Sequence, residues 1–300
     1  MHDFKIATGR SNPELANRVA NILGIDLSET TIQNFSDGEI WVKFEDNVRG
    51  IDLFIIQSTF PPSDNIFELL MLIDAAKRAS VKRVTAVIPY YGYSRQDRKD
   101  QPRVSITAKL VANLLERAGA DRVITIDLHS SQIQGFFDIP LDNLYASPVL
   151  IRAARKLGLE NIAVAAPDVG SVKTARAYAK RLENANLVIV DKRRPQHNVA
   201  EVMNVIGDPS NKHVFIVDDM IDTGTTFIKC AEALKDQGAL DIFGICVHPV
   251  LSGDAIDKLQ NADAVKNIFV TDTIPLKKKT DKFIVASVAE LLSEAIIRTH

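Results

Sequence analysis

Short apolar runs that alternate with helix-period stretches limit the fold of this chain more than any other feature. The runs are rich in β-branched residues and cover 51–56, 84–88, 123–126, 162–165, 187–190, 214–217 and 242–247. Several are separated by stretches with apolar residues at helical spacing, such as 65–79 and 105–118. Strands that alternate with helices form mainly parallel sheets with helices on their faces. The sequence therefore predicts an α/β fold.

Helix boundaries divide this pattern into two halves. Asn12-Pro13 and Ser147-Pro148 each place a capping side chain before a proline, which marks a helix start. The second start follows an irregular segment, 132–146, and opens a new series of strands and helices that closes with a predicted helix over 287–297. We therefore predict two domains of similar rhythm, 1–146 and 147–300.

Composition excludes several function classes. Against 38 Asp and Glu the chain carries 36 Lys and Arg, a net charge of −2, so no global field recruits nucleic acid or an anionic membrane. No apolar stretch approaches the roughly 20 residues of a membrane span. Cys230 and Cys246 lack metal-ligand spacing and are predicted to be reduced core thiols. We expect a cytoplasmic protein without nucleic-acid or membrane partners, whose anion sites are local.

The most informative segment is VFIVDDMIDTGTTF, residues 214–227, which combines an apolar strand, three acids and a turn of small residues before a predicted helix over 227–237. Backbone N–H groups of 223–226 can converge on a phosphate, because the start of a helix has free donors and a positive dipole end. Asp218 and Asp219 can accept hydrogen bonds from vicinal ribose hydroxyls. An Asx-type turn with N-capping threonines explains the same residues without a ligand.

Two further segments suit a nucleotide. Phe35, Asp37 and Glu39 offer a flat aromatic face and carboxylate acceptors for adenine, although an edge hairpin with a solvated Asp-Gly turn fits them equally. The loop 89–103 follows a strand and carries several cations, among them Arg95, that could hold a triphosphate. A charged surface loop is the alternative.

Cations and metal-ligand types also follow predicted strands. Lys192 and Arg194 come after the strand 187–190, where they could neutralise a diphosphoryl group in transfer or form a solvated hairpin tip. His129 and Asp168 follow the strands 123–126 and 162–165 in matching positions. Both residue types can bind a divalent cation, although a lone histidine is usually structural and Mg²⁺ prefers oxygen ligands.

Residues 214–227 resemble the phosphoribosyl-diphosphate motif of the type I phosphoribosyltransferase fold. With FSDGE at 35–39, YYGYSRQDRK at 90–99, DLHSSQIQGFF at 127–137, PDVGS at 167–171 and DKRRPQHN at 191–198, nearly the whole chain resembles the class I ribose-phosphate pyrophosphokinases. The resemblance implies two phosphoribosyltransferase-like (type I) domains, each a mainly parallel sheet flanked by helices. It also implies homo-oligomers, hexamers built from dimers.

The implied reaction transfers the diphosphoryl group of ATP to the anomeric hydroxyl of ribose 5-phosphate, giving 5-phosphoribosyl 1-diphosphate and AMP for nucleotide biosynthesis. The resemblance makes Lys192 and Arg194 catalytic and gives Mg²⁺ to His129 and Asp168. The ATP-binding residues it implies are Phe35, Asp37, Gly38, Glu39, Arg95 and Gln96. Those implied for ribose 5-phosphate are Arg194, Asp218, Asp219, Asp222, Thr223, Gly224, Thr225 and Thr226.

Two other functions stay open from the residues. Thr225 stands where the commoner form of the turn has a smaller residue, a change that backbone donors tolerate. A phosphoribosyltransferase would need only this turn, and would leave 35–39, the loop 89–103 and 191–195 unexplained. A non-catalytic phosphoribosyl-binding relative should have lost ligands, whereas Lys192, His129, Asp168 and Asp218 are all present.

Overall fold

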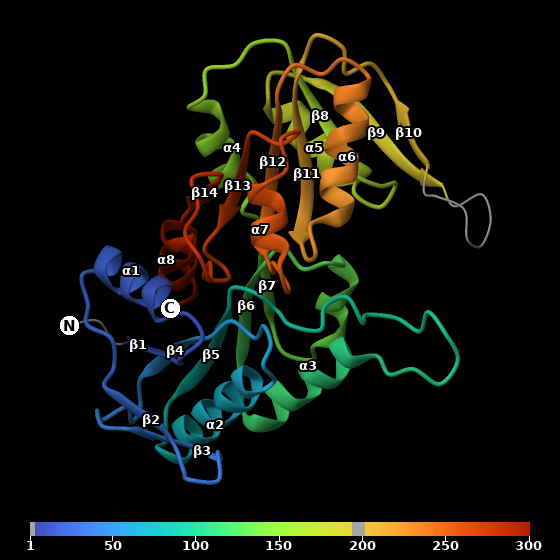
Figure 1. The fold of residues 1–300 in the computed structure, drawn as a ribbon. Helices are drawn as coiled ribbons and strands as arrows, with labels where there is room; N and C mark the ends of the chain where they lie inside the picture. The colour runs from blue at the N-terminus through green and yellow to red at the C-terminus, as the bar shows by residue number, and fades with distance from the viewer. Residues whose placement is uncertain (1–3, 194–201) are drawn as a thin grey trace. The chain divides into compact units, whose positions relative to one another are not determined.

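The computed structural model describes residues 4–193 and 202–300, and the chain forms two compact units (Figure 1). The first unit contains residues 1–145 together with 287–300, and the second contains 146–286. In both, strands and helices alternate as predicted. All seven apolar runs identified in the sequence form strands.

The first unit is built on a five-stranded parallel sheet with the order β1-β4-β5-β6-β7, accompanied by a separate antiparallel hairpin of β2 and β3. Its elements are β1 (Phe4–Thr8), α1 (Pro13–Leu23), β2 (Thr30–Asn34), β3 (Ile40–Phe44), β4 (Asp52–Ile56), α2 (Asp64–Arg78), β5 (Arg83–Ile88), α3 (Thr107–Ala118), β6 (Arg122–Ile126), a 3₁₀ helix (Ser131–Phe136), β7 (Leu141–Leu144) and α8 (Ala289–Thr299).

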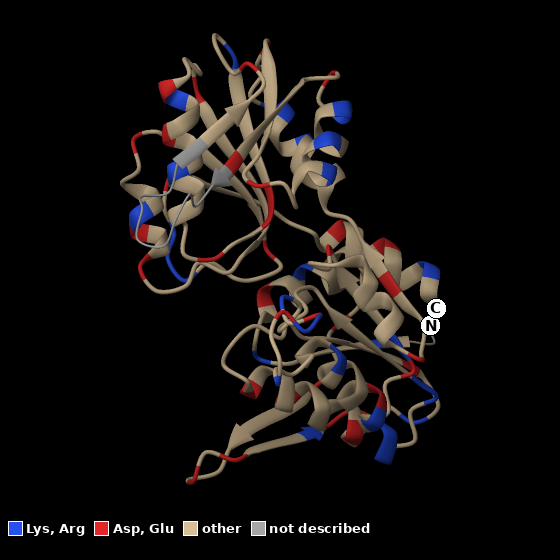
Figure 2. Cartoon of the chain, turned by 90° about the vertical axis from the view of Figure 1, so that its right-hand side faces the viewer, with Lys and Arg blue, Asp and Glu red and all other residues tan. Residues whose placement is uncertain are grey.

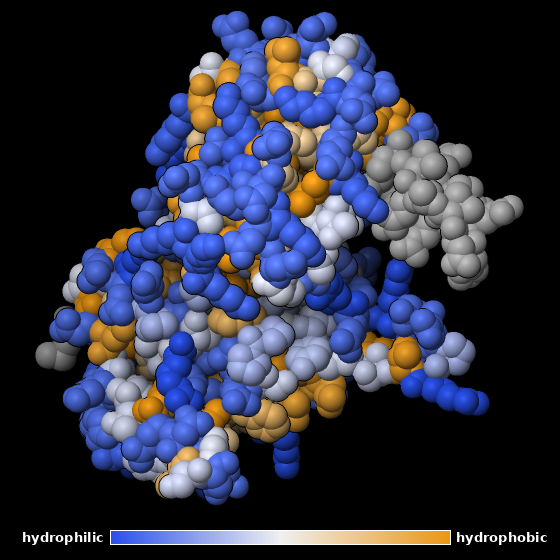
Figure 3. All heavy atoms as spheres, in the orientation of Figure 1, coloured by the Kyte–Doolittle hydropathy of each residue, from blue (hydrophilic) through white to orange (hydrophobic). Residues whose placement is uncertain are grey.

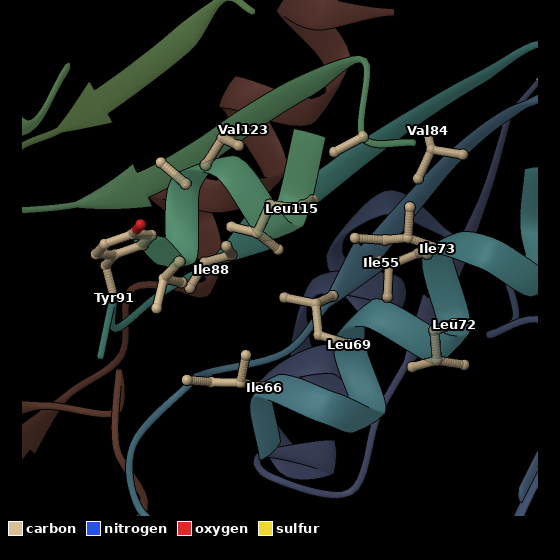
Figure 4. Packing of buried hydrophobic residues seen from close by; sticks show 14 of the residues in the cluster. Ile55, Ile66, Leu69, Leu72, Ile73, Val84, Ile88, Tyr91, Leu115 and Val123 are labelled. Carbon is tan, nitrogen blue, oxygen red and sulfur yellow. The ribbon is translucent and has the colours of Figure 1, made fainter. Parts of the chain in front are cut away.

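Helices α2 and α3 bury their apolar faces against this sheet. Figure 4 shows Leu69 and Ile73 of α2 and Leu115 of α3 close to strand residues such as Ile55 and Val84. All five side chains are fully buried. Burying an aliphatic side chain of this size stabilises the fold by about 1.5–3 kcal/mol, so this layer provides the rigid base for the loops at the carboxyl edge of the sheet.

The second unit has a seven-stranded sheet with the order β10-β9-β8-β11-β12-β13-β14, in which only the pairing of β10 with β9 is antiparallel. Its elements are α4 (Ser147–Arg155), β8 (Ile162–Ala166), α5 (Val172–Arg181), β9 (Asn186–Arg193), β10 (Val202–Ile206), β11 (His213–Ile221), α6 (Thr225–Asp236), β12 (Ile242–Pro249), α7 (Ala255–Gln260), β13 (Asn267–Thr271) and β14 (Phe283–Ala286). Cys230 and Cys246 are buried free thiols, as predicted.

The predicted helix starts differ in their capping. Before α1, the Asn12 side chain accepts a hydrogen bond from the Leu15 N–H at 3.3 Å, and Gly24 ends the helix in the left-handed region. Helix α4 instead begins at Ser147, with Ala146 before it and no side-chain cap. The Ser147 hydroxyl accepts a hydrogen bond from Arg181 at 2.7 Å, so the predicted capping role of Ser147 is wrong.

The last helix corrects the predicted extent of the second domain, 147–300. Helix α8 packs against α1 of the first unit, and Leu292 and Ile296 are fully buried. The Ser293 hydroxyl donates to the Val19 carbonyl of α1 at 3.5 Å, and Arg83 donates to the Thr299 carbonyl at 2.9 Å. The apolar face of α8 is therefore covered by an element far away in the sequence, which local patterns cannot identify.

Charged residues of both signs occur on both units (Figure 2), and hydrophilic residues cover most of the face shown in Figure 3. None of the helices in the described ranges is long and apolar enough to cross a bilayer.

Candidate functional site

In the second unit, the predicted acidic residues lie where the strand order of the sheet reverses. Strand β8 has β9 on one side and β11 on the other, and the chain continues from β11 to β12 and β13 in the opposite direction. Ligand sites of open α/β sheets form at such a switch point, beyond the carboxyl ends of the strands. Asp168 follows β8, and Asp218 and Asp219 lie on β11 past its last pair with β8, Ile216 with Ala165.

Hydrogen bonds join these acidic residues through Ser171. Its hydroxyl donates to Asp218 Oδ1 at 3.2 Å, and its backbone N–H donates to Asp168 Oδ1 at 2.8 Å. Asp218 Oδ1 also accepts from the Asp219 N–H at 2.9 Å. Ser171 therefore links the loop after β8 to β11. It belongs to the segment PDVGS but received no role from the sequence, because the contact with Asp218 spans 47 residues.

The carboxyl group of Asp218 is perturbed by its surroundings. Its pKa is raised from 3.8 to about 8, mostly by burial and in addition by the neighbouring carboxylates of Asp219 and Asp168. Near neutral pH this group therefore holds a proton much of the time. A protonated carboxyl can both donate to and accept from a sugar hydroxyl.

The turn after β11 presents backbone donors to solvent. Helix α6 begins at Thr225, two residues before the predicted start, and Gly224 precedes it with φ +75°. No side chain caps this helix, so the alternative in which threonines act as N-caps is wrong. Thr225 and Thr226 are exposed, and their N–H groups lie in the first turn, where the helix provides no carbonyl partner. An anion is favoured there by these donors and by the helix dipole.

Neighbouring segments support the turn from behind. The N–H groups of Leu251 and Ser252 donate to the carbonyls of Ile221 and Asp222 at 3.0 and 3.1 Å. A Cβ atom at Gly224 would lie 3.0 Å from Leu259 Cγ of α7. Only glycine combines this close approach with a positive φ at low cost, so the sequence and the packing both specify the shape of the turn.

The two predicted catalytic cations are described only in part. Lys192 lies near the carboxyl end of β9, opposite Met203 of β10, which places its backbone at the same edge of the sheet as Asp168. The side chain of Lys192 lies outside the part of the chain that the structure describes. Arg194 lies outside the described residues.

The segment 35–39 forms the loop of the hairpin. Gly38 has φ +98°, its N–H donates to the Phe35 carbonyl at 2.9 Å, and the Glu39 N–H donates to Asp37 Oδ1 at 3.0 Å. The hairpin predicted as the alternative is therefore present. Phe35 is also 51% exposed, so its ring is accessible for stacking on a base.

Arg95 and Gln96 lie in the loop after β5. The turn before them is held against the loop after β4, since the Gly92 N–H donates to Thr59 Oγ1 at 2.7 Å. A Cβ atom at Gly92 would lie 2.0 Å from the Thr59 carbonyl oxygen. The side chains of Arg95 and Gln96 are exposed, and Gln96 Oε1 accepts a hydrogen bond from the Thr107 hydroxyl at 2.6 Å. The start of α3 thus orients the Gln96 amide.

The two predicted metal ligands belong to different units. His129 is exposed in the first unit, two residues after Asp127, whose φ is +40°. Asp168 is exposed in the second unit. Within residues 4–193 and 202–300, no group of three or more His, Cys, Asp or Glu side chains is arranged to hold a metal ion.

Fold and site together define an α/β protein in which a helix start without a side-chain cap follows paired carboxyl groups, an arrangement suited to a sugar phosphate. Comparisons agree with this class. Residues 4–119 match the N-terminal domain of ribose phosphate pyrophosphokinase, and residues 195–300 match the phosphoribosyl synthetase-associated domain.

Relatives with these names extend over the whole chain. A ribose-phosphate pyrophosphokinase of Chlorobaculum tepidum is 55% identical over 299 residues, covering 99% of this chain and 92% of that protein. Another from Wolinella succinogenes is 52% identical, covering 100% and 97%. The crystal structure of phosphoribosylpyrophosphate synthetase from Mycobacterium smegmatis matches with a TM-score of 0.93 at 38% identity, over 99% of this chain and 98% of that one. This chain belongs to the ribose-phosphate pyrophosphokinase family.

Substitution of Gly224 tests whether the shape of the turn matters for stability and for ribose 5-phosphate binding. Gly224→Ala should lower the free energy of unfolding by about 1–2 kcal/mol because of its positive φ, and should weaken ribose 5-phosphate binding at least tenfold because Leu259 forces the turn to move. Gly253→Ala is the matched control, since Gly253 also has positive φ, +61°, with nothing within 4 Å of its added Cβ. Urea unfolding and calorimetry measure both effects. Equal sugar-phosphate affinity in the two variants would contradict the role of the turn.

The raised pKa of Asp218 predicts how stability depends on pH. Between about 4 and 8 the folded protein keeps a proton that the unfolded chain has released, so its free energy of unfolding should fall as pH rises through this window. Asp218→Asn should remove this contribution, and Asp219→Asn should reduce it by removing a like charge. Urea midpoints measured at several pH values provide the check. An identical pH slope in wild type and Asp218→Asn would refute the shift.

Proposed function

We propose that this chain transfers the diphosphoryl group of ATP to the anomeric hydroxyl of ribose 5-phosphate, producing 5-phosphoribosyl 1-diphosphate and AMP for nucleotide biosynthesis. The uncapped start of α6, which follows Asp218 and Asp219 on β11, is the observation that carries the sugar-phosphate part of this proposal. Membership of the pyrophosphokinase family supports the transfer reaction over the simpler phosphoribosyltransferase reaction, for which this turn alone would suffice.

Ribose 5-phosphate binds at the carboxyl edge of the second sheet. The backbone N–H groups and hydroxyls of residues 223–226 hold its phosphate, with Gly224 shaping the turn. Asp218, Asp219 and Asp222 hold the ring hydroxyls, and Ser171 keeps Asp218 in place. Arg194 adds a cation for the phosphate or for the transferred group.

ATP is recognised by residues of the first unit. Phe35 stacks on adenine, and the carboxylates of Asp37 and Glu39 around Gly38 accept hydrogen bonds from the exocyclic amine. The exposed Phe35 ring and the ordered Asp37 turn support this role. Arg95 and Gln96 contact the nucleotide from the loop after β5.

Asp168 and His129 are the proposed ligands of Mg²⁺. Asp168 is a suitable ligand for Mg²⁺, because its carboxylate is exposed and Mg²⁺ prefers oxygen ligands. A cation at this place would also reduce the repulsion between the neighbouring carboxylates of Asp168, Asp218 and Asp219. When bound, Mg²⁺ neutralises negative charge on phosphate oxygens.

The protein contributes orientation and charge to the transfer. Holding the sugar hydroxyl in line with the β-phosphorus of ATP can lower the barrier by about 7–11 kcal/mol in well-oriented systems. Lys192 and Arg194 stabilise the negative charge that redistributes as the bond to the AMP group breaks. By family resemblance the subunits assemble into hexamers built from dimers. The two buried free thiols, Cys230 and Cys246, support the cytoplasm as the place where they act.

Release of AMP tests the reaction and the role of Lys192. NMR of the wild type should show AMP formation from ATP only when ribose 5-phosphate and Mg²⁺ are both present. Lys192→Ala should reduce turnover at least a hundredfold while leaving ATP affinity unchanged, because it removes a cation needed mainly in the transition state. Lys180→Ala, at an exposed position of α5, is the control. An unchanged turnover number in Lys192→Ala would remove it from the mechanism.

A further inference from the structure

A buried polar network in the first unit has no role in the reaction described above. Glu68 of α2 is 2% exposed, and its carboxylate accepts hydrogen bonds from the Arg10 backbone N–H and Arg10 Nε, both at 2.6 Å, and from Gln57 Nε2 at 3.0 Å. Gln57 Oε1 accepts from the N–H and hydroxyl of Ser11 at 3.1 and 2.7 Å. Three donors thus satisfy a buried carboxylate, which makes the network rigid.

The backbone is shaped to admit this network. A Cβ atom at Gly9 would lie 2.4 Å from Gln57 Oε1 and 2.6 Å from Glu68 Oε1. Gly9 follows β1 and Gln57 follows β4, so the network is centred on the carboxyl edge of the first sheet. Any side chain at position 9 would displace it.

Arg10 carries the network outward to the hairpin loop. While its Nε binds Glu68, its Nη1 donates to Asn34 Oδ1 at 2.6 Å. Asn34 Nδ2 in turn donates to the Gly38 carbonyl at 2.8 Å. Three consecutive hydrogen-bonded steps therefore connect buried Glu68 to the loop 35–39.

The loop needs such a connection because hydrophobic packing does not reach it. Among the described residues the hairpin pairs with no strand of the main sheet, and it packs against the core through Ile32, Val42 and Phe44, from its middle and its base. Strand β3 contacts α2, and a groove of about 540 Å³ is lined by residues of both, among them Ile40, Trp41, Phe67 and Met71. Residues 35–39 at its tip are all exposed, and a two-stranded hairpin is marginally stable by itself, so hydrogen bonds from Arg10 and Asn34 can orient the tip where apolar contacts do not.

We propose that Arg10, held by Glu68, is a positioning residue that sets the orientation of the loop 35–39 for recognition of the adenine base. This inference rests on the proposed nucleotide role of that loop. Arginine suits the task because its planar fork binds two partners at once, Glu68 and Asn34, whereas the point charge of lysine cannot match both. The predicted consequence is selective: ATP recognition depends on Arg10, and ribose 5-phosphate recognition does not.

Steady-state kinetics test this selectivity. Arg10→Met and Asn34→Ala should each raise the KM for ATP at least fivefold, with kcat and the KM for ribose 5-phosphate within twofold of wild type. Arg10→Lys should recover part of the loss, and the double variant should be no worse than Arg10→Met, because both residues act in one chain. Arg298→Met is the matched control, since Arg298 forms an exposed ion pair with Glu294 on α8.

Fluorescence of Trp41, the single tryptophan, provides a readout that does not need activity. Acrylamide quenching should increase in Arg10→Met and Asn34→Ala, and stay unchanged in Arg298→Met, because Trp41 lies next to the released loop. Increased quenching without activity in the wild type would count against the proposed reaction while supporting the anchor. Unchanged quenching together with an unchanged KM for ATP, or equal losses for both substrates, would overturn the inference. Asn34 is exposed, so its variant tests the inference even if Arg10→Met fails to fold.

Discussion

Parallel pairing of strands is the constraint on which the sites depend. A parallel strand must be followed by a crossover, so the strands end at one edge of the sheet and the loops there gather residues from distant parts of the sequence. In the second unit this edge brings the loop after β8 to β11, and Ser171 joins them. In the first unit the corresponding edge holds the network of Arg10, Gln57 and Glu68. The buried strands supply rigidity and the edges supply the chemistry.

The two edges handle buried charge differently. Glu68 is enclosed by donors, so its negative charge is fully satisfied and it serves as an anchor. Asp218 faces other carboxylates, and its pKa is raised to about 8 because burial and like charge both disfavour ionisation. The unfavourable burial of a carboxyl group beside like charges is typical of sites where a ligand or a cation binds. The first arrangement suits structure, and the second suits binding.

Several features were predictable because they depend on neighbours in the sequence. The strands, the helix start at Asn12 and the turn around Gly224 follow from apolar runs, a proline and small residues at short spacing. Two predictions were wrong because they depend on contacts with distant residues, namely the capping role of Ser147 and the domain to which α8 belongs. The Ser147 hydroxyl bonds Arg181, and α8 packs on α1, and both partners are remote in the chain. The Arg10 network was not predicted, since Glu68 is an ordinary helix residue until the fold buries it.

The sequence by itself determined the α/β class, the turn that presents backbone donors and the residue types available for sugar, nucleotide and cation binding. These depend on periodicity and on motifs in which the interacting groups are close along the chain. Only the tertiary structure decided that Ser171 contacts Asp218, that burial and like charge raise the pKa of Asp218, and that Arg10 reaches the hairpin loop. Burial and long-range hydrogen bonds produce these properties, and neither exists before the sheets assemble.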